Sequence, residues 1–204
     1  MTGPGKFVVG LTGGIATGKS AVLREFRRLG AGTIDCDRLA RDAVRPGKPA
    51  WLKIRRVFGG RAFSGRVLDR KAVARIVFRD PRKRKALERI IHPEVLREMR
   101  ARISAAKGGV VVADIPLLFE AGWERFVDRT LLVRVPPAVQ LDRLLRREGI
   151  GRGEARSILR AQWPMARKSR RADDRIDNSG PWAATRAQVR RIYRAYLTSQ
   201  REVV

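Results

Sequence analysis

A short apolar segment that runs directly into a glycine-rich loop constrains the fold of this chain more than any other feature. Residues 7–11 are apolar and bounded by glycine, which is typical of a strand buried on both faces. The loop at residues 13–20 (GGIATGKS) follows, and the spacing of apolar residues then predicts a helix over residues 19–29. A buried strand, a glycine loop and a helix in this order predict one βα unit of a parallel sheet.

The loop fits the phosphate-binding pattern G-x-x-x-x-G-K-[ST]. Its glycines let backbone N–H groups turn inward around phosphate oxygens, and the following helix adds the positive end of its dipole. Lys19 would reach the β- and γ-phosphates of ATP, and the Ser20 hydroxyl can ligate the Mg²⁺ that bridges them. We therefore predict that ATP binds to Gly13, Gly14, Ile15, Ala16, Thr17, Gly18, Lys19, Ser20 and Ala21. A glycine turn without a ligand is the alternative, and the strand and helix around the loop disfavour it.

Predicted strands and helices alternate along the rest of the chain. Apolar runs predict strands at 33–35, 110–114, 130–135 and 174–177, and helical spacing predicts helices at 69–78 (capped by Asp69), 81–91, 93–106, 138–147 and 182–197. The stretch 37–109 is interpreted as wholly helical and is too long for a simple crossover. We expect an α/β fold of three layers with a five-stranded parallel sheet.

The same pattern predicts how the chain is divided. We expect a single domain over residues 1–204, in which a core comprises about 1–36, 108–139 and 172–204. A helical insertion would span about 37–107, and a shorter helical segment, a lid, would span about 140–171.

Acidic residues stand at the predicted carboxyl ends of two strands, on the edge where open parallel sheets place their ligands. Asp35 and Asp37 follow the second strand, where a carboxylate can accept the proton of an attacking hydroxyl. On an extended chain successive side chains point to opposite faces. The two carboxylates need not act together, and either could instead cap the next helix. Asp114 ends the third strand and could hold Mg²⁺, or pair with an arginine.

Three basic side chains are further candidates. His92 is the only histidine, and a lone histidine before a proline is more often structural than catalytic. Arg143 and Arg147 share one face of a predicted helix, and on a mobile lid they would stabilise charge on a transferred phosphoryl group and exclude water. Because arginine is abundant in this chain, a solvated helix face is the alternative for each.

The charge balance favours anionic partners. The chain carries 46 Lys+Arg against 20 Asp+Glu, a formal net charge of +26, which admits nucleic acid, an anionic membrane surface or a polyanionic metabolite. The surplus is uneven, because residues 61–107 hold fifteen basic and five acidic side chains whereas residues 108–138 hold three and four. Aromatic residues make up 6% of the chain and are not interleaved with basic ones, so no platform for stacking bases is expected.

The cellular compartment is predicted from cysteine and from targeting signals. A single cysteine, Cys36, cannot form an intrachain disulfide. We expect no signal peptide and no membrane span. A cytoplasmic protein without a membrane partner is therefore predicted.

Several short motifs then occur in an order that is typical of one family. They are 9–15 (VGLTGGI), 18–20 (GKS), 34–37 (IDCD), 90–93 (IIHP), 116–120 (PLLFE) and 176–180 (IDNSG), together with Arg41, Gln162 and Pro164. The chain resembles the bacterial dephospho-CoA kinase family on these residues and over nearly its whole length. The phosphate loop is shared with many NTPases, but the other motifs in this order are much more specific. The family usually has alanine at the position of Cys36.

The resemblance implies transfer of the ATP γ-phosphoryl group to the ribose 3′-hydroxyl of dephospho-CoA, the last step of coenzyme A synthesis. It implies that Asp35 is the base, that Lys19 and Ser20 act on phosphate and Mg²⁺, and that Arg143 and Arg147 belong to the lid. It implies acceptor contacts from Asp35, Asp37, Arg41, His92, Pro116 and Leu117, and a metal site at Ser20 and Asp114. The chain departs from the family at Ala16, Thr17 and Ala21 in the loop and in a less acidic lid.

Two other functions remain open at this point. One is a kinase of the same fold that acts on a nucleoside monophosphate or another small metabolite. The other is a nucleic-acid-binding ATPase, which the net charge suggests. Nucleic acid is not expected as a specific partner, because the phosphate loop and the adjacent acidic residues favour small polyanions such as ATP and dephospho-CoA.

Overall fold

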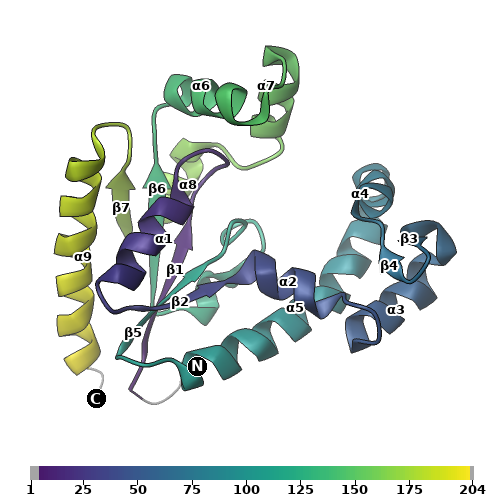
Figure 1. Ribbon diagram of the computed structural model, residues 1–204, viewed down its shortest axis with the longest axis horizontal. Coiled ribbons are helices and arrows are strands. Elements are labelled where there is room, and N and C mark those ends of the chain that lie inside the picture. The colour runs from purple at the N-terminus through teal and green to yellow at the C-terminus, as the bar shows by residue number, and fades with distance from the viewer. Residues whose placement is uncertain (1–4, 203–204) are drawn as a thin grey trace. The chain divides into compact units, whose positions relative to one another are not determined.

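The computed structural model describes residues 5–202, and a five-stranded sheet forms its centre (Figure 1). The strands are β1 (Phe7–Thr12), β2 (Gly32–Asp35), β5 (Val110–Asp114), β6 (Arg129–Arg134) and β7 (Asp174–Asp177). They lie in the order β2-β5-β1-β6-β7, and neighbouring strands are parallel. β1 is central and buried along its whole length, as its unbroken apolar run predicts. The predicted parallel sheet is confirmed.

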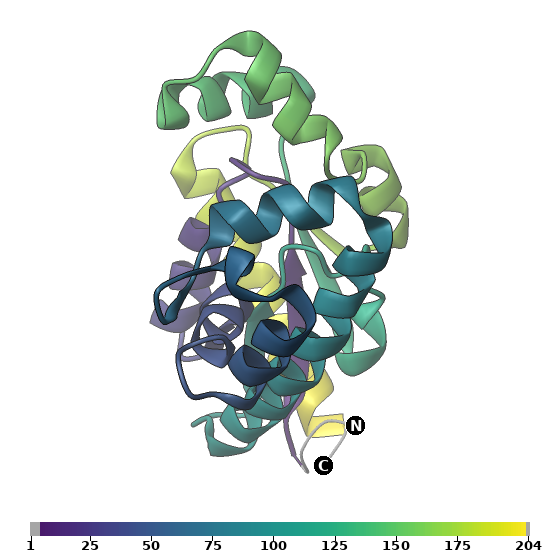
Figure 2. The ribbon, with the colours of Figure 1, turned by 90° about the vertical axis from the view of Figure 1, so that its right-hand side faces the viewer.

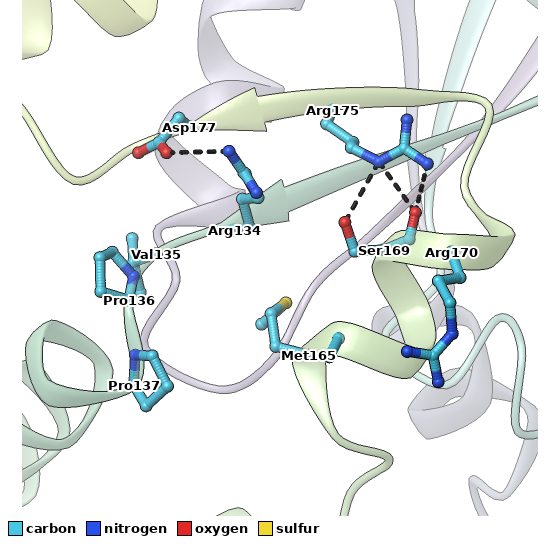
Figure 3. Close-up of a pocket in the computed structure, with 10 residues that line it drawn as sticks. Arg134, Val135, Pro136, Pro137, Met165, Ser169, Arg170, Arg175 and Asp177 are labelled. Carbon is cyan, nitrogen blue, oxygen red and sulfur yellow. Dashed lines mark hydrogen bonds and ion pairs between the residues drawn. The ribbon is translucent and has the colours of Figure 1, made fainter.

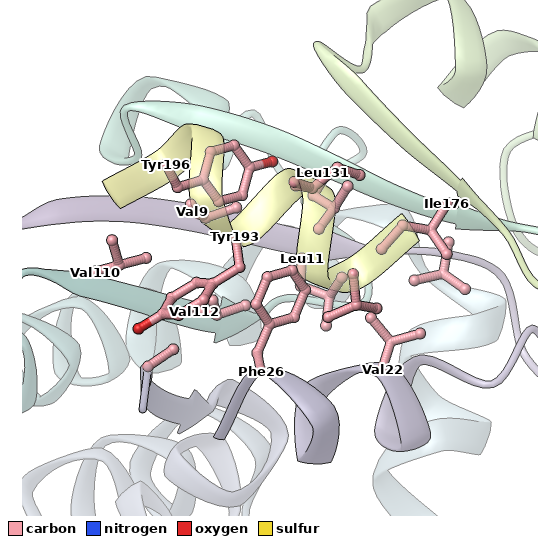
Figure 4. Packing of buried hydrophobic residues seen from close by; sticks show 14 of the residues in the cluster. Val9, Leu11, Val22, Phe26, Val110, Val112, Leu131, Ile176, Tyr193 and Tyr196 are labelled. Carbon is pink, nitrogen blue, oxygen red and sulfur yellow. The ribbon is translucent and has the colours of Figure 1, made fainter. Parts of the chain in front are cut away.

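Two helices cover one face of this sheet, α1 (Lys19–Arg28) and α9 (Trp182–Glu202). Phe26 of α1 and Tyr193 and Tyr196 of α9 pack between the helices and the strands (Figure 4). The rings of Phe26 and Tyr196 are stacked with centroids 6.5 Å apart, a separation at which aromatic pairs attract one another beyond their burial. This cluster holds α1, and with it the preceding glycine loop, against the sheet.

The other face is covered by the chain between β5 and β6 and by α8 (Met165–Arg171). Leu118, Phe119 and Trp123 are buried there, the last in a short 3-10 helix, η2 (Trp123–Phe126). A Cβ on Gly10 of β1 would come within 3.1 Å of Leu118, so glycine permits this close approach. With both faces covered, the predicted three-layer α/β architecture is confirmed.

A buried carboxylate joins the two helices of the first face. Glu25 of α1 lies 2.8 Å from Arg28, 3.5 Å from Arg186 and 4.0 Å from Arg190, the last two on α9. The hydrogen bond from Arg28 lowers the pKa of Glu25, and together with the neighbouring arginine charges it outweighs the opposing effect of burial. A carboxylate with a lowered folded-state pKa stabilises the fold at neutral pH, and this contribution is lost as the pH falls through that pKa.

We predict that Glu25→Gln destabilises the protein by about 1–2 kcal/mol at pH 7, because three arginines lose their shared anion. The loss is limited because water reaches two of these arginines, Arg28 and Arg190. Urea unfolding at pH 7 and again below about pH 4, where glutamate protonates in the unfolded chain, measures the difference. The gap between variant and parent should shrink in acid. An equal gap at both pH values would assign the effect to packing.

Residues 36–101 form a compact unit of their own. Its helices are α2 (Cys36–Ala43), α3 (Pro49–Phe58), α4 (Arg70–Arg79) and the larger part of α5 (Pro81–Ala105); Figure 2 shows them in blue to teal. Ile54 and Phe58 of α3 and Val73 of α4 lie in its core. The Asp69 carboxylate accepts a hydrogen bond from the Ala72 N–H at 3.0 Å, which confirms the predicted cap of α4.

Two predictions for this unit are wrong. It is not wholly helical, because a 3-10 turn, η1 (Gly60–Ala62), leads into a small antiparallel hairpin of β3 (Phe63–Ser64) and β4 (Val67–Leu68). Gly65 has φ 58°, a left-handed value that glycine adopts freely at a hairpin turn.

The second error is the break expected before Pro93, since α5 is one continuous helix that contains this proline. Proline removes a backbone hydrogen bond and usually ends a helix, at a cost of about 3 kcal/mol. Here the residues on both sides are anchored: Ile90 and Ile91 pack on the unit's core, and Val95 and Met99 are buried. This apolar burial outweighs the local preference of proline.

Three helices join β6 to β7: α6 (Pro137–Glu148), α7 (Arg152–Arg160) and α8. In Figure 1, α6 and α7 lie beyond the tip of β6, at the carboxyl edge of the sheet. Across residues 5–202, no helix combines the length and the apolar character that crossing a membrane requires.

Candidate functional site

The glycine loop connects β1 to α1 and adopts a conformation that its glycines permit. Gly18 has φ 90°, and a Cβ at this position would overlap the side-chain amide of Asn178. A Cβ on Gly14 would overlap the amide of Gln140 in the same way. The Thr17 hydroxyl donates to the Gly14 carbonyl at 2.8 Å and closes the loop on itself. The loop is therefore packed tightly on both sides.

The amino end of α1 has no side-chain cap. Gly18 is the N-cap residue, and no side chain accepts a hydrogen bond there. The first N–H groups of a helix lack partners within the helix and carry partial positive charge. An uncapped helix start behind a glycine loop is the arrangement that binds phosphate in many proteins, as the sequence pattern predicts.

The side chain of Asn178, the residue after β7, connects the loop to this strand by hydrogen bonds. Its side-chain N–H donates to the Thr17 carbonyl at 2.8 Å, and its amide oxygen accepts from the Thr185 hydroxyl at 2.9 Å. Arg143 of α6 donates to the Asn178 carbonyl at 2.9 Å. Arg143 is therefore placed beside the loop, whereas Arg147 is about half exposed and pairs with Glu148 at 2.7 Å.

Lys19, Asp35 and Asp114 meet at the carboxyl edge of the sheet. Asp35 ends β2 and Asp114 ends β5, and the two are paired in the strand register. The Lys19 ammonium lies 3.8 Å from the Asp114 carboxylate, and both side chains are largely buried. Asp35 is exposed. Asp114 thus lies against the loop lysine, and an exposed carboxylate stands on the neighbouring strand.

Asp37 does not continue the strand. α2 begins at Cys36, so Asp37 lies in the first turn of a helix, and the extended conformation expected to continue through Asp37 is wrong. An acidic side chain in a first helical turn interacts favourably with the helix dipole.

A cavity of about 660 Å³ opens beside the carboxyl ends of β6 and β7 (Figure 3). Arg134, Arg170 and Arg175 line it together with prolines 136 and 137 and Met165. Asp177 pairs with Arg134 at 3.4 Å, and Arg175 donates to Ser169. Three guanidinium groups against one carboxylate make this cavity basic.

The remaining predicted acceptor contacts lie in two places. Pro116 and Leu117 follow β5; the Pro116 carbonyl accepts from the Thr12 hydroxyl at 3.1 Å and Leu117 is exposed. Arg41 lines a cavity of about 430 Å³ within the unit 36–101. His92 of α5 is half-buried in that unit, where burial lowers the pKa of its imidazole and the Glu88 carboxylate partly opposes the shift.

The cavity at Arg41 is strongly basic. Its lining includes Arg38, Arg45 and Arg70 besides Arg41, and its carboxylate, Asp42, pairs with Arg45 at 2.8 Å. Such a lining suits a ligand with several phosphate oxygens.

The donor set for a metal is small but of the right kind. Within residues 5–202, no group of three or more His, Cys, Asp or Glu side chains could by itself hold a metal ion. Ser20 offers a hydroxyl and Asp114 a carboxylate, and hard oxygen donors in small number are what Mg²⁺ uses when phosphate and water supply its other ligands. The residues present therefore fit Mg²⁺ bound together with a nucleotide.

Three amide side chains that contact the loop received no role from the sequence alone. Asn178 and Gln162 belong to the motifs that carry the family resemblance, so a signal for them was present. Gln140 had none, because a glutamine on a helix can serve any purpose. Its contact with the loop joins residues 125 positions apart.

Comparison with known proteins identifies the family. A family model described as dephospho-CoA kinase matches residues 7–183, most of the chain. This chain belongs to the dephospho-CoA kinase family. A relative named dephospho-CoA kinase from Carboxydothermus hydrogenoformans is 45% identical over 187 residues, covering 89% of this chain and 90% of the relative. Another, from Geobacillus kaustophilus, is 45% identical over 185 residues, covering 89% and 92%.

Solved structures agree with this membership. A crystal structure of a Thermus thermophilus protein matches with a TM-score of 0.86 and 36% identity, covering 94% of this chain and 98% of that one. The dephospho-CoA kinase from Campylobacter jejuni has a TM-score of 0.67 at 24% identity, covering 94% and 98%, and therefore supports the fold. Dephospho-CoA kinases use ATP in the final step of coenzyme A synthesis, so the chain is an enzyme of the kinase class.

Proposed function

We propose that this chain transfers the γ-phosphoryl group of ATP to the ribose 3′-hydroxyl of dephospho-CoA and that Asp35 is the base. The observation that carries the proposal is the placement of Asp35 and Asp114 side by side at the sheet edge, with Lys19 of the loop 3.8 Å from Asp114. In the reaction the acceptor oxygen bonds to the γ-phosphorus, ADP leaves, and the hydroxyl proton passes to the Asp35 carboxylate.

On the donor side, the loop residues Gly13 to Ala21 would hold the phosphates through backbone N–H groups and the uncapped start of α1. Lys19 would neutralise charge on the β- and γ-phosphates. Ser20 and Asp114 would hold Mg²⁺, which when bound offsets the negative charge of the phosphates. Asp114 also keeps the Lys19 ammonium at the sheet edge.

The helical segment of residues about 140–171 is proposed as the lid. Arg143 already contacts the loop region through the Asn178 carbonyl, so a small movement would bring its guanidinium to a nucleotide. Arg147 lies on the same face of α6, one turn further on, and is exposed. Both would stabilise charge that develops on the transferred phosphoryl group.

On the acceptor side, we assign the unit 36–101 to dephospho-CoA. The basic cavity with Arg41 would bind the diphosphate of the acceptor. Asp37, His92, Pro116 and Leu117 would complete the contacts, and exposed Leu117 offers an apolar surface. Location in the cytoplasm, where ATP is abundant, is part of the same proposal and agrees with a chain whose single cysteine cannot form an intrachain disulfide.

An acceptor-swap assay tests the proposal. ADP formation from ATP and Mg²⁺ is measured with dephospho-CoA, with AMP, with RNA and without any acceptor. We expect turnover with dephospho-CoA at least a hundredfold above each of the others, because the acceptor hydroxyl must be positioned for attack. Preferential use of AMP would replace the assignment by a nucleoside monophosphate kinase, and stimulation by RNA would replace it by a nucleic-acid-dependent ATPase.

A further inference from the structure

Two glutamines hydrogen-bond to the backbone of one residue of the phosphate loop, Ile15. The side-chain N–H of Gln140, on α6, donates to the Ile15 carbonyl at 2.8 Å. The Ile15 N–H donates to the side-chain oxygen of Gln162, just before α8, at 3.1 Å. Gln140 begins the lid segment and Gln162 lies between its helices α7 and α8, so the lid contacts both backbone polar groups of Ile15.

Ile15 is followed by a strained residue. Ala16 has φ 61°, the left-handed region that costs a residue with a Cβ about 1–2 kcal/mol. Such a conformation persists where surrounding contacts over-determine it. The hydrogen bonds to Ile15 supply those contacts on one side of Ala16, and the bond between the Thr17 hydroxyl and the Gly14 carbonyl supplies another.

A buried ion pair in turn fixes Gln162. Glu120, after β5, accepts a hydrogen bond from the Trp163 N–H at 3.2 Å, and the same oxygen lies 2.7 Å from the Lys168 ammonium. The Lys168 side chain is fully buried and that of Glu120 is 16% exposed. Because Trp163 is the next residue after Gln162, Glu120 connects the backbone that carries Gln162 to the segment that follows β5.

We propose that Gln140 and Gln162 are positioning residues that keep the phosphate loop in its nucleotide-binding form, and that Glu120 and Lys168 act on the nucleotide through Gln162. This deepens the proposed function and rests on it. Preorganised N–H groups bind phosphate more tightly, because no conformational entropy is lost in ordering the loop on binding. We call the two hydrogen bonds from Gln140 and Gln162 to Ile15 the clamp. Loss of the clamp weakens nucleotide binding and leaves acceptor binding and the chemical step nearly unchanged.

The first test is direct binding of ADP with Mg²⁺, measured by calorimetry without any acceptor. We expect Gln162→Ala to raise the Kd for ADP about tenfold, the effect of one lost hydrogen bond to a preorganised loop. In turnover assays its KM for ATP should rise similarly, while kcat and the KM for dephospho-CoA stay within about twofold. An unchanged Kd for ADP in the folded variant would overturn the proposal.

Paired glutamate variants separate the hydrogen bond from the added charge. Gln162→Glu keeps an oxygen that can accept from the Ile15 N–H, whereas Gln140→Glu sets an oxygen against the Ile15 carbonyl. Both variants add one negative charge beside the backbone of Ile15. We expect Gln140→Glu to weaken ADP binding more than Gln162→Glu, and the reverse order would contradict the proposed geometry.

Glu120→Gln tests the indirect role, with Glu124→Gln as its matched control. Glu124 of η2 pairs at 2.6 Å with Arg171 of α8, the helix that also carries Lys168. We expect Glu120→Gln to weaken ADP binding in the otherwise wild-type protein and to add less than about twofold once Gln162→Ala is present, since residues that act through one another are non-additive. Equal weakening by Glu124→Gln, or full additivity, would overturn it.

The design also separates this proposal from the assignment of the acceptor. ADP binding does not involve the acceptor. If dephospho-CoA is not turned over but Gln162→Ala still raises the Kd for ADP, the proposed acceptor is rejected and the role of the clamp stands. If dephospho-CoA is turned over but Gln162→Ala binds ADP normally, the role of the clamp is rejected and the proposed reaction stands.

Discussion

Asp35→Asn is expected to lower turnover by about 10²–10⁴-fold, the usual contribution of a general base. Asparagine has nearly the same shape as aspartate but cannot take up the proton of the attacking hydroxyl. Asp35 is exposed at the end of β2 and is paired in register with Asp114, so the change leaves the Lys19–Asp114 contact in place. The Kd for ADP should therefore stay within about twofold of the parent. Initial rates of ADP formation and calorimetric binding measure the two effects.

The control for this prediction is the same change at another strand end. Asp173→Asn removes a carboxylate that accepts hydrogen bonds from the N–H and hydroxyl of Thr130 at the opposite edge of the sheet. It should lower stability and leave turnover within about twofold. If Asp35→Asn keeps more than about a tenth of parental turnover, another group accepts the proton.

The parts of the site that could be predicted are those encoded over short stretches of chain. The loop pattern, the buried strand before it and the helix after it lie within residues 7–29, and together they predict a phosphate site from local geometry. Asp35 and Asp114 were found because parallel strands end at a common edge. Neither deduction needed knowledge of how distant segments pack.

The parts that could not be predicted depend on contacts between distant segments. Pro93 ends a helix by its local preference, and only burial of Val95 and Met99 reverses that preference. Nothing in the sequence pairs Gln140 with Ile15, or marks Lys168 as fully buried when the chain contains 46 basic residues. Family motifs flagged Gln162 and Asn178 without giving them a role, and the structure supplies their hydrogen-bond partners.

Lys19→Met is expected to lower kcat/KM for ATP by about 10³-fold. Methionine keeps a long apolar side chain but removes the ammonium that would stabilise charge on the β- and γ-phosphates, a contribution of the size that one preorganised electrostatic contact makes in phosphoryl transfer. The change also leaves the largely buried Asp114 carboxylate without the lysine 3.8 Å away. Most of the effect should fall on kcat, because the charge interaction strengthens as the phosphoryl group is transferred.

Lys6→Met is the matched control. The Lys6 ammonium donates to the carbonyls of Ala106 and Gly108 at 2.8 and 2.7 Å, at the amino end of β1, so this change removes a lysine from the same strand–loop–helix segment at the edge away from the glycine loop. It should reduce stability by about 1–2 kcal/mol and leave kcat/KM within about twofold. If the Lys19→Met protein stays folded and keeps more than about a tenth of parental kcat/KM, Lys19 does not have the proposed role in phosphoryl transfer. In that event Arg143, whose guanidinium already reaches the Asn178 carbonyl beside the loop, becomes the cation to remove next.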